Sequence, residues 1–509
     1  MGKDILREII NIAIALSEEK NFEKLLSLIL EKSMDLTSSD AGSLYLVFKD
    51  GLHFKIAKNR SISISFEETI LPISDESIAG FVALKGDPVN LKDAYHISSS
   101  SPFHFHKNID DMIGYRTKSI LAIPMKNHKE EVIGVLQLIN KKKDKNIILK
   151  TVDDVEKEVV SYSFKDQNLM LALSSLAAVS IENNQLYKEI ENLFEGFVKA
   201  SVKAIEQRDP TTSGHSLRVS ILTLGLAESI NKIKEGPFQK VFFDEISMKE
   251  LKYAALLHDF GKVGVREEVL VKAKKLYPVE LERIWWRIEY EKKNVKLKYL
   301  MKKFQEKDEK KHYEIEKEEE EKLKELDEIY KTIIKANEPT ILPEGDFQFL
   351  QNLKNYYYES PEKKLEPILN ENEIKILSIR KGSLSEEERL QIESHVTHSY
   401  NFLIQIPWTK DLKGIPEIAF AHHEKLNGSG YPRNIKDNQI PLQAKIMSIA
   451  DIFDALSASD RPYKKALSVD RALDILKMEA EDGMLDGELV RIFFEEKIWE
   501  RTLHLRLTR

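Results

Sequence analysis

The sequence of 509 residues contains no cysteine. This absence excludes a disulfide framework and any zinc site built from thiolates, and it leaves the redox compartment undetermined. The sequence also has no stretch that approaches the roughly 20 apolar residues of a membrane-spanning helix. The apolar segment 9–16 is too short for a span, and charged residues follow it closely, which argues against a signal peptide. We therefore expect a cytoplasmic protein without a membrane span.

Basic residues are not in excess, because 77 lysines and arginines stand against 84 aspartates and glutamates, for a formal net charge of -7. A protein that coats nucleic acid needs a basic face for the phosphate backbone. We therefore expect no nucleic-acid partner. The length suffices for two or three domains, each with its own core.

Histidine and aspartate, in contrast, recur in patterns that suit a metal centre. A His258-Asp259 doublet lies inside the apolar run 253–262, and a His422-His423 doublet precedes a Gly-Tyr-Pro tripeptide. An ionised carboxylate in an apolar segment is costly unless a cation or a donor compensates it. Nitrogen and oxygen donors without thiolates suit Fe, Mn, Ni or Zn, so the pattern favours a metal-assisted phosphoester hydrolase.

A dinuclear centre needs about seven protein ligands, with at least one carboxylate that bridges the two cations. Consecutive residues on a helix point about 100° apart, so we expect His258 and Asp259 to lie on one helix and to reach metals near one wall of it. The full set of candidate metal ligands is His215, His258, Asp259, His395, His422, His423 and Asp451.

The first segment alternates helical and strand-like patterns. Apolar residues recur at helical spacing over 4–36, and a closing helix is predicted over 166–187. The order of helix, strands and closing helix predicts an α+β sandwich over residues 1–185. The predicted strands are 41–48, 119–124 and 132–141.

Parts of this segment resemble the GAF domain family, namely residues 40–46, 120–124 and 134–141. The resemblance covers most of the segment. It implies that residues 1–185 form a sensor domain with the GAF fold.

A short motif in this segment is similar to one found in GAF domains that bind cyclic nucleotides. It consists of Asn140, Lys141 and Asp166, but the glutamate that should follow the aspartate is Gln167 here. We expect these residues to hold strand ends and caps of the fold. A small molecule or a cyclic nucleotide bound at this domain is the alternative.

A linking helix is predicted over 186–205. Leu186, Ile190, Leu193 and Phe197 recur at steps of four, three and four, which is the spacing of a heptad seam. Such a seam can pack on its own domain or form a parallel coiled coil with a second chain. We expect the second arrangement and therefore a homodimer.

The third segment is interrupted by a strongly charged stretch, about 282–381. Lysine and glutamate alternate at helical spacing over 307–324, which is typical of a solvated helix, and 337–345 breaks the pattern. We predict a protruding helical insertion that is structural or contacts a partner.

Several blocks of the third segment resemble the HD-GYP family, a branch of the HD phosphohydrolases that typically degrades cyclic di-GMP. The resemblance covers about 198–275 and 375–490, and it implies an all-α bundle with the site at its centre. We therefore predict a multidomain chain whose catalytic domain is 206–509. The matching blocks are 208–219, 258–264, 393–395, 422–432, and 451–456 with 461–464.

The resemblance implies two divalent metals per chain, iron or manganese. One is held by His215, His258, Asp259 and Asp451, and the second shares Asp259 and takes His395, His422 and His423. Some members hold a third metal through a glutamate whose position is Thr211 here, so we expect two. The family's usual glycine is replaced by Ser399, and the neighbouring His398 is not expected to be a ligand.

We expect His258, Asp259 and Lys262 to be the catalytic residues. The candidate substrate-binding residues are Lys262, Tyr431, Arg461 and Lys464. The three cationic side chains would contact phosphate, and the phenol of Tyr431 would contact phosphate or guanine. The predicted reaction is hydrolysis of cyclic di-GMP to linear pGpG, GMP or both, under control of the sensor domain. The alternatives are a hydrolase of another cyclic dinucleotide or phosphorylated nucleotide, and a catalytically silent receptor for cyclic di-GMP.

Overall fold

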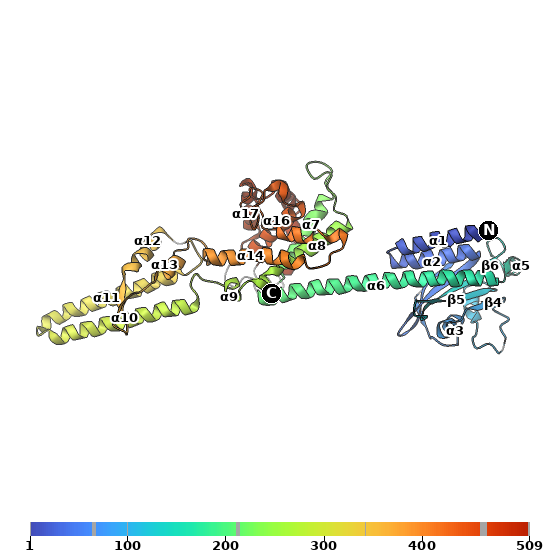
Figure 1. Cartoon of the computed structure of the whole chain (residues 1–509), viewed down its shortest axis with the longest axis horizontal. Helices are drawn as coiled ribbons and strands as arrows, with labels where there is room; N and C mark the ends of the chain where they lie inside the picture. Colours follow the sequence, from blue (N-terminus) through green and yellow to red (C-terminus); the bar gives the residue numbers. More distant parts are fainter. Residues whose placement is uncertain are drawn as a thin grey trace. The chain divides into compact units, whose positions relative to one another are not determined.

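The computed structural model describes residues 2–63, 68–98, 100–209, 214–341, 343–458 and 466–506. The chain divides into two compact units, Met1–Phe194 and Glu195–Arg509 (Figure 1). Across the described ranges, no helix combines the length and the apolar character of a membrane span.

The first unit is built on an antiparallel sheet with the strand order β3-β2-β1-β6-β5-β4, and β7 pairs with β6. Side chains alternate between the two faces of each strand, so Leu44 and Leu46 face a core shared with α1, α2 and α6, while Tyr45 faces a second core shared with α3. The strands are β1 (Ser39–Phe48), β2 (Gly51–Asn59), β3 (Thr69–Leu71), β4 (Val89–Leu91), β5 (Ile120–Lys126), β6 (Val132–Lys142) and β7 (Val159–Val160).

The helix predicted over 4–36 is two helices in the structure. The side chain of Asn21 accepts a hydrogen bond from the backbone N–H of Lys24 at 3.0 Å and so caps a new helix. The helices of this unit before α6 are α1 (Gly2–Glu18), α2 (Phe22–Thr37), α3 (Ile78–Lys85), α4 (Lys107–Ile113) and α5 (Val152–Glu158).

The predicted closing helix and the predicted linking helix are one continuous helix of 45 residues, α6 (Phe164–Arg208). Its first part contributes Met170, Leu173 and Ile181 to the core of the first unit. Its last part lies in the second unit, where Val198 and Ile205 are buried. No proline or glycine pair interrupts the sequence between these parts, which agrees with an unbroken helix.

Asn140, Lys141 and Asp166 act within the fold of the first unit, as predicted. Asn140 is buried at a φ of 53°, and its side chain accepts a hydrogen bond from the backbone N–H of Lys118 at 2.7 Å. Lys141 forms an ion pair with Asp166, and Asp166 also accepts a hydrogen bond from the backbone N–H of Ser163 at 2.7 Å.

The second unit contains a helical bundle, which confirms the predicted all-α architecture. Within its described residues, α7 packs on α8 and α16, and α14 packs on α15 and on the short 3-10 helix η2. The main elements are α7 (His215–Ile230), α8 (Glu245–Leu257), η2 (Phe260–Gly264), α9 (Glu267–Leu270), α14 (Glu386–Leu403), α15 (Ile415–Phe420), α16 (Leu442–Ser457), α17 (Val469–Glu481), α18 (Gly487–Glu495), η6 (Ile498–Thr502) and α19 (Leu503–Arg506).

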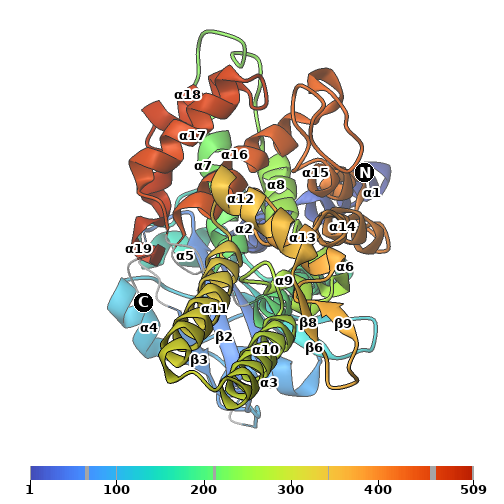
Figure 2. The same ribbon diagram turned by 90° about the vertical axis from the view of Figure 1, so that its left-hand side faces the viewer.

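The insertion is a subdomain of this unit and is not helical throughout. Its two long helices lie side by side (Figure 2), and a short antiparallel pair of strands, β8 and β9, corrects the expectation of a purely helical insertion. The insertion also has its own hydrophobic core, which draws on both long helices and on the residues that follow them. Its elements are α10 (Pro278–Gln305), α11 (Glu309–Ala336), α12 (Glu344–Asn352), η3 (Leu353–Asn355), β8 (Tyr357–Glu359), β9 (Leu365–Pro367) and α13 (Glu371–Leu377).

Candidate metal centre

The His258-Asp259 doublet lies where α8 ends and η2 begins, so the prediction that one helix carries both residues was wrong. His258 still has helical backbone angles, but Asp259 has φ -91° and ψ 3°. The close approach of η2 to α14 explains the turn: a Cβ atom on Gly261 would lie 1.9 Å from the backbone oxygen of His395. Only glycine fits this contact, which brings the doublet next to the helix that carries His395.

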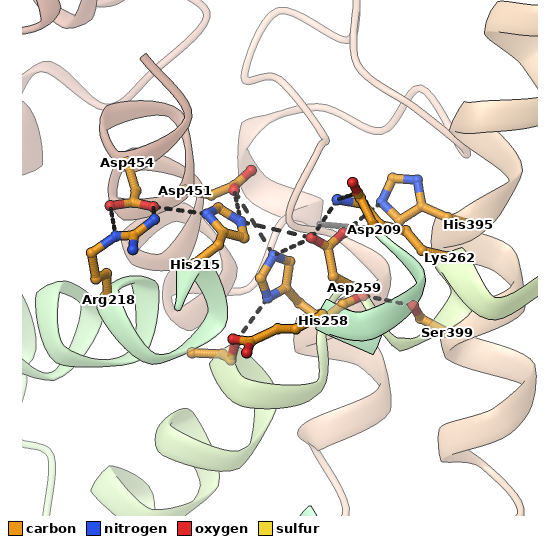
Figure 3. Close-up of polar contacts among 12 residues, drawn as sticks. Asp209, His215, Arg218, His258, Asp259, Lys262, His395, Ser399, Asp451 and Asp454 are labelled. Atoms are coloured by element: carbon orange, nitrogen blue, oxygen red, sulfur yellow. Dashed lines mark hydrogen bonds and ion pairs between the residues drawn. The ribbon is translucent and has the colours of Figure 1, made fainter. Parts of the chain in front are cut away.

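Ser399 closes the same contact with two hydrogen bonds. Its buried hydroxyl donates to the backbone oxygen of His258 at 2.6 Å and accepts from the N–H of Gly261 at 2.8 Å (Figure 3). Ser399 therefore connects α14 to the backbone of the doublet and of η2 through hydrogen bonds. His398, its neighbour, is exposed and lies outside both groups of candidate ligands described next.

Six of the seven candidate ligands form two groups whose nitrogen and oxygen atoms lie within 4.8 Å of one another inside each group. The seven candidates come from five places that converge at the centre of the bundle: α7, the α8–η2 junction, α14, the turn after α15, and α16. One group is His215, His258 and Asp259, and the other is His395, His422 and His423.

Two carboxylates face both groups. Asp259 places Oδ2 at 3.5 Å from Nε2 of His258 and Oδ1 at 3.3 Å from Nε2 of His395. Asp451, the seventh candidate, places Oδ1 at 3.1 Å from Nε2 of His215 and Oδ2 at 3.8 Å from Nδ1 of His423. A shared role was predicted for Asp259, but the equivalent position of Asp451 was not foreseen, because it depends on where α16 packs.

Three of the imidazoles present a nitrogen that takes part in no hydrogen bond within the described residues. Nε2 of His258, His395 and His422 is buried and accepts or donates no hydrogen bond within the described part of the chain. In each ring Nδ1 donates to the backbone oxygen three residues earlier, at 2.7 Å for His258 and 2.6 Å for the other two. Because Nδ1 carries the proton, Nε2 holds a free lone pair, as a metal-binding imidazole requires.

The charge states fit cation binding. Burial lowers the pKa of His395, lowers that of His422 well below its usual value, and lowers that of His423 to about 3, so these rings are neutral. Burial alone would raise the pKa of Asp259, but nearby positive charge, above all the ammonium of Lys262, outweighs it and holds that pKa well below the usual range. The neutral imidazoles of His395, His422 and His423 beside ionised carboxylates are a donor set that divalent transition metals take.

His215 is held from behind by a pair of residues to which the sequence assigned no role. Its Nδ1 donates to Oδ2 of Asp454 at 2.9 Å, and the guanidinium of Arg218 donates to the two oxygens of Asp454 at 2.8 and 3.0 Å. Burial opposes protonation of His215, but the carboxylates of Asp451 and Asp454 raise its pKa to about 9. A carboxylate behind a ligating histidine fixes the direction of the ring. The spacing of Arg218, three residues after His215, could have suggested this pair.

Lys262 lies on η2, the short 3-10 helix that follows the doublet. Its ammonium lies 2.9 Å from Oδ2 of Asp259 and 3.3 Å from Oδ2 of Asp209 (Figure 3). The cation is therefore at the centre, where it neutralises two carboxylates.

Tyr431 lies in the loop after the second histidine doublet, and its ring centroid is 4.8 Å from that of His423. The loop is held by the buried Glu424, which accepts hydrogen bonds from the backbone N–H groups of Arg433 at 2.8 Å and Ile435 at 3.1 Å. Glu424 falls in the block 422–432, but the sequence alone assigned no role to it. Gly430 has no room for a side chain, because a Cβ atom there would lie 2.5 Å from Cα of Glu424.

Arg461, Lys464 and Thr211, which the sequence analysis also singled out, lie outside the described residues. The predicted substrate contacts of the first two, and the argument from Thr211 against a third metal, stay predictions.

Models of known protein families match parts of both units. A family model described as a GAF domain matches residues 21–181, and two models described as HD domains match residues 212–375 and 372–489. Among solved structures, the GAF domain of a phosphoenolpyruvate-protein phosphotransferase from Coxiella burnetii aligns with 36% of this chain and 96% of its own, at 16% identity and a TM-score of 0.28.

Two curated relatives match shorter parts of the chain. A 3'3'-cGAMP-specific phosphodiesterase of Vibrio cholerae serotype O1 is 41% identical over 96 residues, which is 19% of this chain and 20% of the relative. A cyclic di-GMP phosphodiesterase of Thermotoga maritima is 35% identical over 118 residues, 23% of this chain and 31% of the relative. The chain thus covers between a fifth and a third of the length of these relatives. From the family matches and the two units of the fold, the chain carries a GAF domain followed by an HD domain.

Proposed function

We propose that the second unit is a metal-dependent phosphodiesterase that hydrolyses a cyclic dinucleotide, with cyclic di-GMP as the preferred substrate. The observation that carries the proposal is the pair of ligand groups, buried except for the half-buried His423, that two carboxylates join. Three of their Nε2 atoms are buried and take part in no hydrogen bond within the described residues. The names of the relatives in Vibrio cholerae and Thermotoga maritima support a cyclic dinucleotide as the substrate class.

The chain's own residues provide the ligands for two cations. His215, His258, Asp259 and Asp451 would hold one, and Asp259, His395, His422 and His423 would hold the other. When bound, two divalent cations would lower the pKa of a water molecule and offset the negative charge of the phosphodiester. We propose iron or manganese, because imidazoles mixed with carboxylates suit both.

The remaining residues bind and orient the substrate. The ammonium of Lys262 lowers the pKa of Asp259, lies within ion-pair distance of Asp209, and can donate to a non-bridging phosphate oxygen. Burial raises the pKa of Tyr431, so its hydroxyl stays protonated and can donate to phosphate, while its ring can stack on a guanine. Arg461 and Lys464 are proposed as partners of the second phosphate.

The test is a hydrolysis assay of protein purified without oxygen and supplied with iron or manganese. We expect cyclic di-GMP to be converted to linear pGpG, GMP or both, faster than 3'3'-cGAMP. Faster hydrolysis of 3'3'-cGAMP would reassign the substrate within the proposed class. Binding of cyclic di-GMP without hydrolysis by metal-loaded protein would instead identify a silent receptor.

We also propose that the first unit regulates this activity through α6 and that two chains pair along α6. The side chains of the predicted seam are exposed on α6, Leu193 at 76%. Leu176 and Val179, also exposed, extend the same spacing toward the start of the helix. The last residues of α6 reach the catalytic elements: Arg208 donates to the backbone oxygen of Val265, directly after η2, at 3.0 Å. A shift of α6 would therefore act on the segment that carries Lys262.

A further inference from the structure

The insertion forms its own core without using the outward side of α10. Ile284, Ile288 and Val295 of α10 are buried against α11. At 100° per residue these three positions share one side of the helix, the side that faces its neighbour. The pair of helices α10 and α11 is thus packed through this side, and the side chains on the opposite side of α10 do not contribute to that core.

That opposite side is apolar over the last turns of α10. Leu297, Leu300, Met301 and Phe304, which we call the outer stripe, lie about half a turn around the helix from the buried positions. All four are exposed, Leu300 at 63% and Phe304 at 94%. An isolated exposed leucine needs no explanation, but four such residues on one side of one helix form a surface suited to binding.

Lysines border the outer stripe. Lys293 and Lys296 lie on the same side of α10 and, among the residues that the structure describes, take part in no ion pair, whereas Lys302 and Lys303 are paired with glutamates of α11. Over residues 293–304 this side of the helix carries no acidic residue. An occupant must therefore be apolar where it meets the stripe and negatively charged at its border.

We propose that the outer stripe of α10 binds an anionic phospholipid surface, with its apolar side chains entering the headgroup region and Lys293 and Lys296 contacting lipid phosphates. Helices that lie on membranes have this composition: leucine and aromatic residues on one face, bordered by lysine. Juxtaposed lysines are drawn to anionic lipids over about one Debye length. A second copy of α10 fits less well, since the helix has eight basic against four acidic residues and the same face would meet its like charges.

The experiment measures binding of the full chain to vesicles by co-sedimentation. Vesicles of phosphatidylcholine alone are compared with vesicles that also contain phosphatidylglycerol. We expect binding to the anionic vesicles only, and weaker binding at high salt. The double variants Leu300→Ser with Phe304→Ser, and Lys293→Glu with Lys296→Glu, are each expected to bind at least about tenfold more weakly, because each removes one of the two contributions.

The control reverses the same number of charges on the outward side of the neighbouring helix, with Lys317→Glu and Lys324→Glu, both at exposed positions of α11. This variant should bind anionic vesicles nearly as well as the unchanged chain. The proposal is wrong if the unchanged chain ignores anionic vesicles, if it binds both vesicle types equally, or if the control and the outer-stripe variants lose binding alike. It is also wrong if the Leu300→Ser, Phe304→Ser variant changes the mass of the protein in solution, since the stripe would then join two copies. Circular dichroism confirms that each variant is folded.

Discussion

Three histidines of the candidate centre use the same local device. His258, His395 and His422 each donate Nδ1–H to the backbone oxygen three residues earlier, which fixes the tautomer and aims Nε2 at the centre of the bundle. The sequence predicted these residues as ligands, but their common geometry comes from their positions in or just after helical turns. A helix end thus sets which nitrogen faces a cation.

Ser399 is the clearest residue-scale test of how the doublet is positioned. Replacing it with alanine leaves the backbone N–H of Gly261 and the backbone oxygen of His258 buried without their partner. We expect Ser399→Ala to lower the free energy of unfolding by about 1–3 kcal/mol. Urea denaturation followed by circular dichroism measures this loss.

The matched control for that experiment is Ser394→Ala on the same helix. The hydroxyl of Ser394 donates only to the backbone oxygen of Gln391 on the exposed side of α14, so its loss should change stability by less than about 0.5 kcal/mol. Equal effects of the two substitutions would show that Ser399 has no special place between α14 and the doublet.

At the scale of elements, the sequence predicted two separate helices where the structure has one continuous helix, α6. Its apolar spacing was recognised, but no local signal shows that a closing helix continues into a linking helix. The helix predicted over 4–36, in contrast, is broken where the side chain of Asn21 caps a new helix. This cap can be recognised in the sequence only once the break is known. Element boundaries were therefore less predictable than the elements themselves.

The exposed seam of α6 predicts a dimer that depends on Leu193. Replacing Leu193 with aspartate removes two buried leucines from a symmetric pair, each contributing about 1.5–3 kcal/mol, so the dissociation constant should rise roughly 100-fold or more. Analytical ultracentrifugation measures the mass of the full chain. Leu84→Asp, a change of the same kind at an exposed position of α3, serves as the control and should remain a dimer. A monomeric unchanged chain, or a dimeric Leu193→Asp variant, would refute the seam.

At the scale of the whole molecule, the sequence predicted the order of the domains and the ligands that meet in the second unit. The seven candidate ligands span residues 215 to 451, yet the structure brings all of them to one centre. The sequence could predict these residues as a set because the motifs that contain them are specific. What the sequence could not supply is the packing: the turn at Asp259, the double-facing Asp451, and the insertion's strands and separate core all depend on contacts between distant segments.

Elemental analysis of protein purified without oxygen tests whether the second unit holds a dinuclear centre that depends on Asp259. We expect two transition-metal ions per chain in the unchanged protein and the loss of both in Asp259→Ala, because this carboxylate faces both groups. His398→Ala, which alters an exposed histidine on the same helix as His395, should keep both ions. Retention of two metals by Asp259→Ala, or their absence from the unchanged protein, would show that the second unit does not hold a dinuclear centre that depends on Asp259.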